Sequence, residues 1–393
     1  MSFFHGVTTT IVNDGPRTIS LPSSSIIGLV DTFTASTGPL VEGVPTAVAG
    51  VPYMITTERE AIAAFGADSA ITRACKAIYV RAKAVIVAVG VEKIDDAAAL
   101  TSAVIGGVKA NGDRTGLQAL LDGKSRFNAQ PRLLIAPLHS STQAVATAMD
   151  ALAEKLGAIG IIDGPGTTDE AAMEYALNFG SKRLYMVDPG VISWSTTANA
   201  DVASGGSAWA AGMFAYTDAT YGFWVSPSNK EMVGITGTTR QVEYLENDPT
   251  CRANLLNNAF ITTIIRDGGY RLWGNRTLSS DAKWSFVTRV RTLDIIMSAV
   301  QAGHKWAVDL GITKTYVKDV TEGLQAFMRD LKAQGAIINF EVYPDLEMTT
   351  ASMLSQGRIF WRIRFTDVPV AENPTFLFEV TDQWVTQVLD IKS

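Results

Sequence analysis

Two strand-like segments near the carboxyl end of this sequence constrain its fold more than any other feature. Apolar and polar side chains alternate in both segments, which is the pattern of half-buried β-strands. The apolar side chains are Ile359, Trp361, Ile363 and Phe365 in the first segment and Phe376, Phe378 and Val380 in the second. A strand edge carries free N–H and C=O groups, which proteins normally pair, cover or protect with charge. We expect the second segment to pair outside its own domain.

Hinges separate these strands from the rest of the chain. Pro369 and Pro374 interrupt the carboxyl-terminal pattern, and Gly15 and Pro16 interrupt a similar pattern within residues 1–25. The amino-terminal side chains expected on strands are Val7, Thr9, Ile11, Ile19 and Leu21. We interpret both ends as hinged β-arms that add strands to a neighbouring sheet, the mode of binding called β-augmentation. The alternative is that both arms fold back onto their own domain.

Helical and strand patterns alternate between about residue 57 and residue 250. Capping boxes at Thr57-x-x-Glu60 and Thr167-x-x-Glu170 predict two helix starts. Strand patterns lie between the helices, in KAVIVAVGV, RLLIAP, AIGIIDG and RLYMVDPG. This alternation predicts an α/β layer domain.

The pattern changes after about Cys251. Two long helices, about 287–307 and 315–333, precede NFEVYPD and the terminal strands, which predicts an α+β domain. The fold class is therefore a multidomain α/β and α+β protein with extended β-arms. The expected division is an N-terminal β-arm over residues 1–25, an α/β domain over 26–250, an α+β domain over 251–365 and a C-terminal β-arm over 366–393.

Composition argues against several classes of protein. The net charge of -6 does not suit a protein whose whole surface binds nucleic acid, because such binding needs an excess of Lys and Arg. Cys75 and Cys251 are far apart and no histidines cluster, so we expect neither a disulfide framework nor a metal site. The start, MSFFHGV, lacks the features of a secretion signal, and the longest clean apolar run spans Ala84–Val91. A membrane helix needs about 20 residues. We therefore expect a cytoplasmic origin and no membrane insertion.

An α/β domain also suits an enzyme or a ligand-binding protein, because such sheets bind ligands at the carboxyl ends of their strands. Asp163 in IIDGPG and Asp188 in MVDPG follow two predicted strands. Either could be catalytic, although Asp before Gly or Pro is also ordinary turn chemistry. No phosphate-binding, GxGxxG, HExxH or GxSxG pattern accompanies them. We expect no catalytic residue and no cofactor, with a site near Asp163 and Asp188 as the alternative.

One predicted helix carries a row of cations. At 100° per residue, Lys314, Lys318, Arg329 and Lys332 fall within about 60° of one another, beside the apolar face of the same helix. A solvated helix face explains this row, and a docking edge for an acidic partner explains it as well.

Seven segments of the sequence together resemble the tail sheath proteins of contractile-tailed phages. They are MSFFHGV, GPRTISLPSSSIIGLVDTF, GLQALLDGKSRFNAQPRLL, CRANLLNNA, IIRDGGYRLWGNRTLSSD, TKTYVKDVTEGLQAFMRDLK and FTDVPVAENPTF…EVTDQW. The resemblance extends from Met1 to about Asp390 and is closest to the sheaths of R-type pyocins and related temperate phages.

This resemblance implies a structural protein without enzymatic activity. Sheath subunits of this kind stack as hexameric rings in a helical sleeve around a tail tube, begin in a metastable extended state, and contract to drive the tube through a bacterial envelope. The arms would be exchanged between subunits, the α/β domain would lie outside, and the α+β domain would face the tube through the cationic row.

The implied partners are other copies of the chain, the tail tube protein, and baseplate and tail terminator proteins. The subunits would be assembled in a bacterial cytoplasm as part of a phage virion tail or of a released bacteriocin particle.

Overall fold

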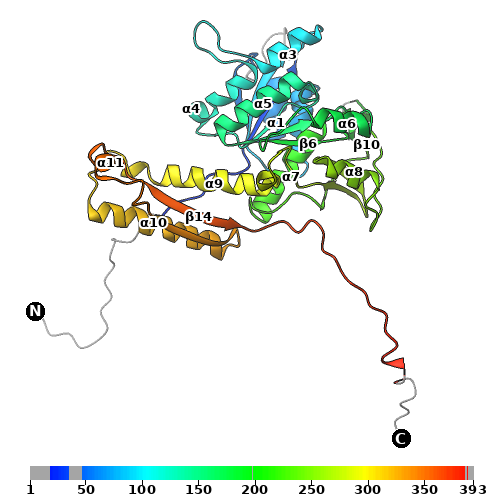
Figure 1. Cartoon of the computed structure of the whole chain (residues 1–393). Coiled ribbons are helices and arrows are strands. Elements are labelled where there is room, and N and C mark those ends of the chain that lie inside the picture. Colours follow the sequence, from blue (N-terminus) through cyan, green and yellow to red (C-terminus); the bar gives the residue numbers. More distant parts are fainter. Residues whose placement is uncertain (1–17, 35–46, 197, 386, 388–393) are drawn as a thin grey trace, which may run out of the picture.

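The computed structural model describes residues 18–34, 47–196, 198–385 and 387. They form an α/β body with a smaller module of helices and a β-hairpin beside it, and a long carboxyl-terminal segment runs away from both (Figure 1). The arm positions Val7, Thr9, Ile11, Gly15 and Pro16 lie outside the described residues.

A nine-stranded sheet forms the centre of the body, in the order β2-β3-β1-β4-β5-β6-β11-β12-β9. The strands from β3 to β11 in this order are parallel, and β2, β12 and β9 are antiparallel to their neighbours. The strand bounds are β1 Ile27–Phe33, β2 Pro52–Ile55, β3 Ile86–Glu92, β4 Leu133–Ile135, β5 Ile159–Asp163, β6 Leu184–Val187, β9 Lys230–Glu231, β11 Ile261–Arg266 and β12 Tyr270–Trp273.

Both faces of this sheet are buried because successive residues of its parallel strands are apolar. In β1, Leu29 packs into the core on one face and Val30 into the core on the other. The first core also contains residues of α1 Glu58–Phe65, α2 Ala70–Tyr79 and α7 Gly206–Thr220. The second contains residues of α3 Ala97–Ile105, α5 Gln143–Leu156 and α6 Asp169–Ala176. This arrangement confirms the predicted α/β layers.

The large sheet extends past the boundary expected at residue 251. β11 is parallel to β6, and β12 turns back along β11. The apolar run of β11 therefore completes the body, although the sequence pattern places it in the second domain.

One of the two predicted helix starts is displaced by one residue. Thr57 caps α1 as expected: its side chain accepts from the N–H of Glu60 at 3.3 Å, and the Glu60 carboxylate accepts from the N–H of Thr56 at 2.7 Å. For α6 the capping residue is Thr168, which accepts from the N–H of Ala171 at 3.1 Å. Two adjacent threonines compete for that position, and the sequence pattern alone favoured the first.

Shorter elements connect the larger ones, in the body and, for η4, in the module. A small sheet has the strand order β10-β7-β8. The bounds are β7 Val191–Ser195, β8 Ala200–Ser204, β10 Gly237–Thr238, α4 Gly123–Phe127, α8 Arg252–Asn258, and the 3-10 turns η1 Gly116–Asp122, η2 His139–Ser141, η3 Ala282–Trp284 and η4 Lys305–Ala307.

The module beside the body has its own hydrophobic core. Its elements are α9 Val287–Gly303, α10 Lys314–Ala333, β13 Ile337–Pro344, α11 Ala351–Ser355 and β14 Trp361–Asp367. Side chains of α9, α10, β13 and β14 pack together in this third core. No helix in the described part of the chain has the length and apolar character needed to cross a membrane.

Two buried ion pairs join α9 to the body. Arg291 pairs with Asp218 of α7, and Asp294 pairs with Arg183 at the start of β6. Each of these four side chains is at most 7% exposed. These pairs fix the position of α9 on the body, because loss of either partner would leave an unpaired buried charge.

Candidate assembly interface

The two-stranded sheet of the module has an open edge on each side. β13 and β14 pair with each other and with no other strand among the described residues. Phe340 lies opposite Phe365, and Val342 lies opposite Ile363. These side chains belong to the third core, yet Phe340, Ile363 and Phe365 are only half-buried. A partly covered apolar face beside two unpaired edges is able to accept further strands.

The C-terminal arm has the matching character of a strand donor. Residues 368–380 contain no helix or strand, and the segment extends away from the module (Figure 1). Phe376, Phe378 and Val380 are 76%, 94% and 98% exposed. Alternate residues of an extended segment share a face, so these three side chains would form one apolar stripe in a strand. Large apolar side chains with such exposure are typical of a surface that another molecule covers.

The described end of the N-terminal arm is attached to its own subunit. Ile19 packs against the third core, and Leu21 is 37% exposed. Ser24 donates its hydroxyl to Asp218 at 2.6 Å, and its carbonyl accepts from Arg291 at 3.2 Å. Residues 18–25 contain no strand in this subunit, contrary to the expectation for Ile19 and Leu21, because the segment is fixed by these contacts to the body.

The cationic row predicted from the sequence lies on α10. Lys314, Lys318, Arg329 and Lys332 are all exposed, whereas the opposite face of the helix is buried in the third core. Lys318 is 3.8 Å from Glu322, one turn away, and both side chains are more than half exposed. Lys332 donates to the side chain of Asn339 on β13 at 3.0 Å. The row is thus available to an acidic surface.

Asp163 is a structural carboxylate. It is 3% exposed and accepts hydrogen bonds from the N–H of Leu138 at 2.9 Å, the N–H of Ser207 at 2.8 Å and the hydroxyl of Ser207 at 2.7 Å. Ser140 adds a longer hydrogen bond at 3.3 Å. Burial raises the pKa of Asp163. Its hydrogen bonds tie the loop after β4 to the start of α7, and leave it no access to a substrate.

Asp188 has a similar role. It is fully buried, accepts from the N–H of Gly166 at 2.7 Å and pairs with Arg240. Arg240 also pairs with Asp169, which in turn accepts from Arg252 at 2.6 Å. Burial raises the pKa of Asp188. Both candidate catalytic residues therefore hold loops together, as turn chemistry suggested.

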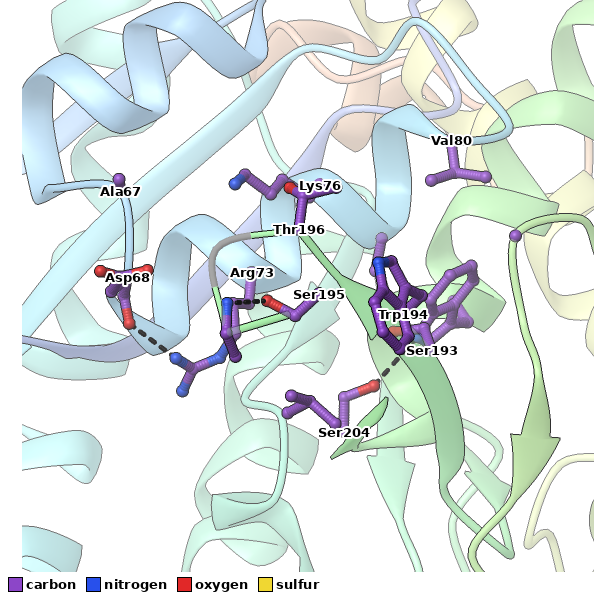
Figure 2. A pocket seen from close by; sticks show the side chains of 15 residues that line it. Ala67, Asp68, Arg73, Lys76, Val80, Ser193, Trp194, Ser195, Thr196 and Ser204 are labelled. Atoms are coloured by element: carbon purple, nitrogen blue, oxygen red, sulfur yellow. Dashed lines mark hydrogen bonds between the residues drawn. The ribbon is translucent and has the colours of Figure 1, made fainter. Parts of the chain in front are cut away.

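A surface pocket lies between α2 and the hairpin of β7 and β8 (Figure 2). Arg73, Lys76 and Val80 line one side, and Trp194 lines the other with 55% of its surface exposed. Arg73 donates to the backbone carbonyl of Asp68 at 2.6 Å. The side chains of this pocket do not include Asp163, Asp188 or a nucleophile paired with a base, so the pocket gives no support to an enzymatic function.

Two family models match successive segments of this chain. The family model of the phage tail sheath protein central domain matches residues 112–278, and that of the phage tail sheath C-terminal domain matches residues 279–381. The chain is 68% identical over 391 residues to a prophage protein of Pseudomonas aeruginosa (strain UCBPP-PA14) that is named as a major tail sheath protein, with 100% of both chains covered. The chain belongs to the phage tail sheath family.

Further relatives extend across the length of this sheath protein. It is 32% identical over 397 residues to the tail sheath protein of Escherichia phage P2, with 98% of each chain covered. The helical sheath of the anti-feeding prophage in its contracted state superposes with a TM-score of 0.69 at 19% identity, covering 98% of this chain and 100% of the other. The PVC sheath complex of an extracellular contractile injection system gives a TM-score of 0.68 at 15% identity, covering 98% and 99%.

These comparisons establish a sheath fold and a structural family without enzymatic activity. They confirm the resemblance to tail sheath proteins and assign the chain to a phage or prophage tail.

The ion pairs that organise this sheath protein leave no signal in the sequence pattern. Arg276 binds Glu372 across 96 residues of sequence, and Arg291 binds Asp218 across 73. Each partner is a common surface residue type, and no local pattern connects residues so far apart. Only the fold brings these charges together.

Proposed function

We propose that this chain is the repeating subunit of a contractile tail sheath, in which hexameric rings stack into a sleeve around a tail tube. The observation that carries the proposal is that one chain combines an exposed apolar arm with a two-stranded sheet open at both edges. The arm of one copy would pair with the hairpin of another through backbone hydrogen bonds. Because donor and acceptor are different surfaces, this contact is able to repeat head to tail, which gives rings where the rotation closes and helical sleeves where it does not.

Contraction would then be a rearrangement of rigid subunits between two packings. The exchanged arms keep neighbours joined while other contacts break and reform. The extended sleeve needs only a kinetic barrier to persist, so firing requires no nucleotide or other fuel. The released energy would drive the tube through a bacterial envelope.

In this proposal the body faces outward and the module faces the tube. The row of Lys314, Lys318, Arg329 and Lys332 would contact an acidic tube surface. Baseplate and tail terminator proteins would bind the two ends of the sleeve. Assembly would take place in a bacterial cytoplasm, and the product would be a phage tail or a headless particle such as an R-type pyocin.

Electron microscopy of the purified protein tests the arm exchange. The full-length chain should form hollow, regularly striated cylinders, and a chain lacking residues 374–393 should not. Deletion removes Phe376 and Phe378, each of which contributes about 1.5–3 kcal/mol when buried. Long sleeves formed by the truncated chain would contradict the proposal.

Two point substitutions distinguish the burial of one face of the arm from nonspecific hydrophobic association. Phe378→Asp places a charge on the face expected to be buried and should abolish the cylinders. Leu377→Asp changes a neighbour that is equally exposed at 94%, but on the opposite side of an extended strand, and should be tolerated. Equal effects of the two substitutions would mean that the arm does not bind as a strand.

A further inference from the structure

The C-terminal arm is attached to its own subunit at two points, one at the end of β14 and one beyond it. Both carboxylate oxygens of Asp367, the last residue of β14, accept from the Nε of Arg289 at 3.0 Å. Five residues later, Glu372 binds Arg276: its Oε2 accepts from Nη2 at 2.6 Å and its Oε1 from Nε at 3.0 Å. Residues 368–371 therefore lie between two ion pairs, along a groove whose lining includes Asn254 and Trp273 of the body.

The guanidinium of Arg276 is held in place before it meets the arm. The rings of Phe260 and Phe286 each lie 5.5 Å from it, and the backbone of Arg276 forms a β-bridge with Phe286. Phe260 has a φ of 63°, a left-handed conformation that is rare for a bulky side chain. A fork-shaped donor fixed between two rings suits bidentate binding of one carboxylate.

Beyond Glu372 the arm is free of the body. Residues 373–385 are all exposed, and the hydrogen bonds that the structure shows within this range are local ones, such as that from Val385 to Asp382 at 3.0 Å. The transition from attached to free chain is therefore at Asn373, between Glu372 and the expected hinge at Pro374. The other expected hinge, Pro369, lies inside the attached part.

We propose that Arg276 is a positioning residue: by holding Glu372 it sets where the exchanged arm begins and which neighbouring copy the arm reaches. This proposal rests on the arm exchange proposed above. An extended chain spans about 3.3–3.6 Å per residue, so the 20 residues from 374 to 393 reach about 66–72 Å. Release of Glu372 would free residues 368–373 as well and add about 20 Å.

The added length has a direct consequence for specificity. A longer flexible tether reaches more acceptor hairpins and lowers the effective concentration of the arm at the correct one. The ion pair thus favours a single neighbour and a single register without contacting that neighbour.

Distances between spin labels test the role of Arg276 in the dispersed full-length subunit. Labels at Ala371→Cys, in the attached part of the arm, and at Gln334→Cys, at the end of α10, report the position of the arm. The native Cys75 and Cys251 are buried and do not interfere. The unsubstituted pair should give one narrow distance distribution. Arg276→Gln and Glu372→Gln should each replace it with a broad one, and the charge exchange Arg276→Glu with Glu372→Arg should restore a narrow peak.

The matched control is Glu341→Gln, which removes an exposed ion pair with Arg364 on the outward face of the same hairpin. This control should leave the distribution narrow. High salt should broaden the unsubstituted distribution, because it screens a partly exposed pair. A distribution that stays narrow in both Arg276→Gln and Glu372→Gln would overturn the proposal.

Failure of this proposal is distinguishable from failure of the arm exchange. Cylinders formed without residues 374–393 would refute the proposed exchange of arms. The label distances in the full-length subunit would still show whether Arg276 holds the arm. Conversely, loss of cylinders on deletion with unchanged label distances would keep the exchange and reject Arg276 as the positioning residue.

Discussion

Removing Asp218 should be among the most damaging single changes in the chain. Arg291 and Asp218 have side chains that are 4% and 2% exposed. Arg291 donates to the two carboxylate oxygens at 2.9 Å and 2.5 Å and to the carbonyl of Ser24 at 3.2 Å. Asp218→Asn leaves a buried guanidinium without its counter-charge. Breaking a buried pair in this way costs about 3–5 kcal/mol.

Replacing both partners should cost much less than removing one. Breaking a buried pair strands a charge, whereas two apolar residues of similar volume leave none. Arg291→Met combined with Asp218→Leu should therefore recover most of the free energy of unfolding lost in Asp218→Asn. The comparison separates the cost of a stranded charge from the contribution of the pair itself.

Chemical denaturation of the dispersed subunit measures these differences. The free energy of unfolding follows from the midpoint and slope of the transition in urea. Glu341→Gln, which opens the exposed pair with Arg364, serves as the control and should change stability by less than about 1 kcal/mol. If Asp218→Asn also lowers the free energy of unfolding by less than about 1 kcal/mol, water reaches the site and the pair does not behave as a buried one.

Three further outcomes are expected. Lys318→Glu with Arg329→Glu should weaken binding of the sheath to its tube and reduce the salt dependence of that binding, measured by co-sedimentation; unchanged binding would make the row ordinary solvated surface. The hydrogen bond from the N–H of Thr56 holds the pKa of Glu60 below its usual value. This hydrogen bond therefore stabilises the fold fully above a pH of about 4.3, and its contribution is lost as the pH falls through the lowered pKa of Glu60. Glu60→Ala should lower the free energy of unfolding at pH 7 and should not lower it in strong acid. Gly106 has a φ of 68°, and a Cβ added there would lie 1.8 Å from the backbone oxygen of Thr115. Left-handed strain alone costs about 1–2 kcal/mol. Gly106→Ala should therefore lower the free energy of unfolding by more than this amount in a denaturation assay.

Local patterns predicted the layers because they depend on neighbours in sequence. Alternating helices and strands indicated the α/β body, and the capping box at Thr57 located the start of α1. The domain boundary expected at residue 251 was wrong for β11, because the parallel pairing of β11 with β6 depends on a crossover that leaves no trace in the local pattern. Sequence order alone did not show that β11 completes the larger sheet.

The exposed apolar stripe of the C-terminal arm could be predicted from the sequence, and the contacts that attach the two arms to their own subunit could not. Alternation in Phe376, Phe378 and Val380 identified the exposed arm. Ile19 kept its apolar character but uses it on its own subunit, because Ser24 and Arg291 fix the adjoining chain. The attachment of the arm at Glu372 follows from three-dimensional proximity to Arg276 and could not be read from either residue alone.

The two ion pairs of α9 have opposite polarity along the helix. Arg291 meets an acid, and Asp294, three residues later, meets a base. A slide of α9 by three residues, about 4.5 Å, would bring Arg291 toward Arg183 or Asp294 toward Asp218, and both juxtapositions repel. The contact between α9 and the body therefore favours a single register. In the contraction proposed above, such a contact would keep the module and the body moving together as one rigid unit.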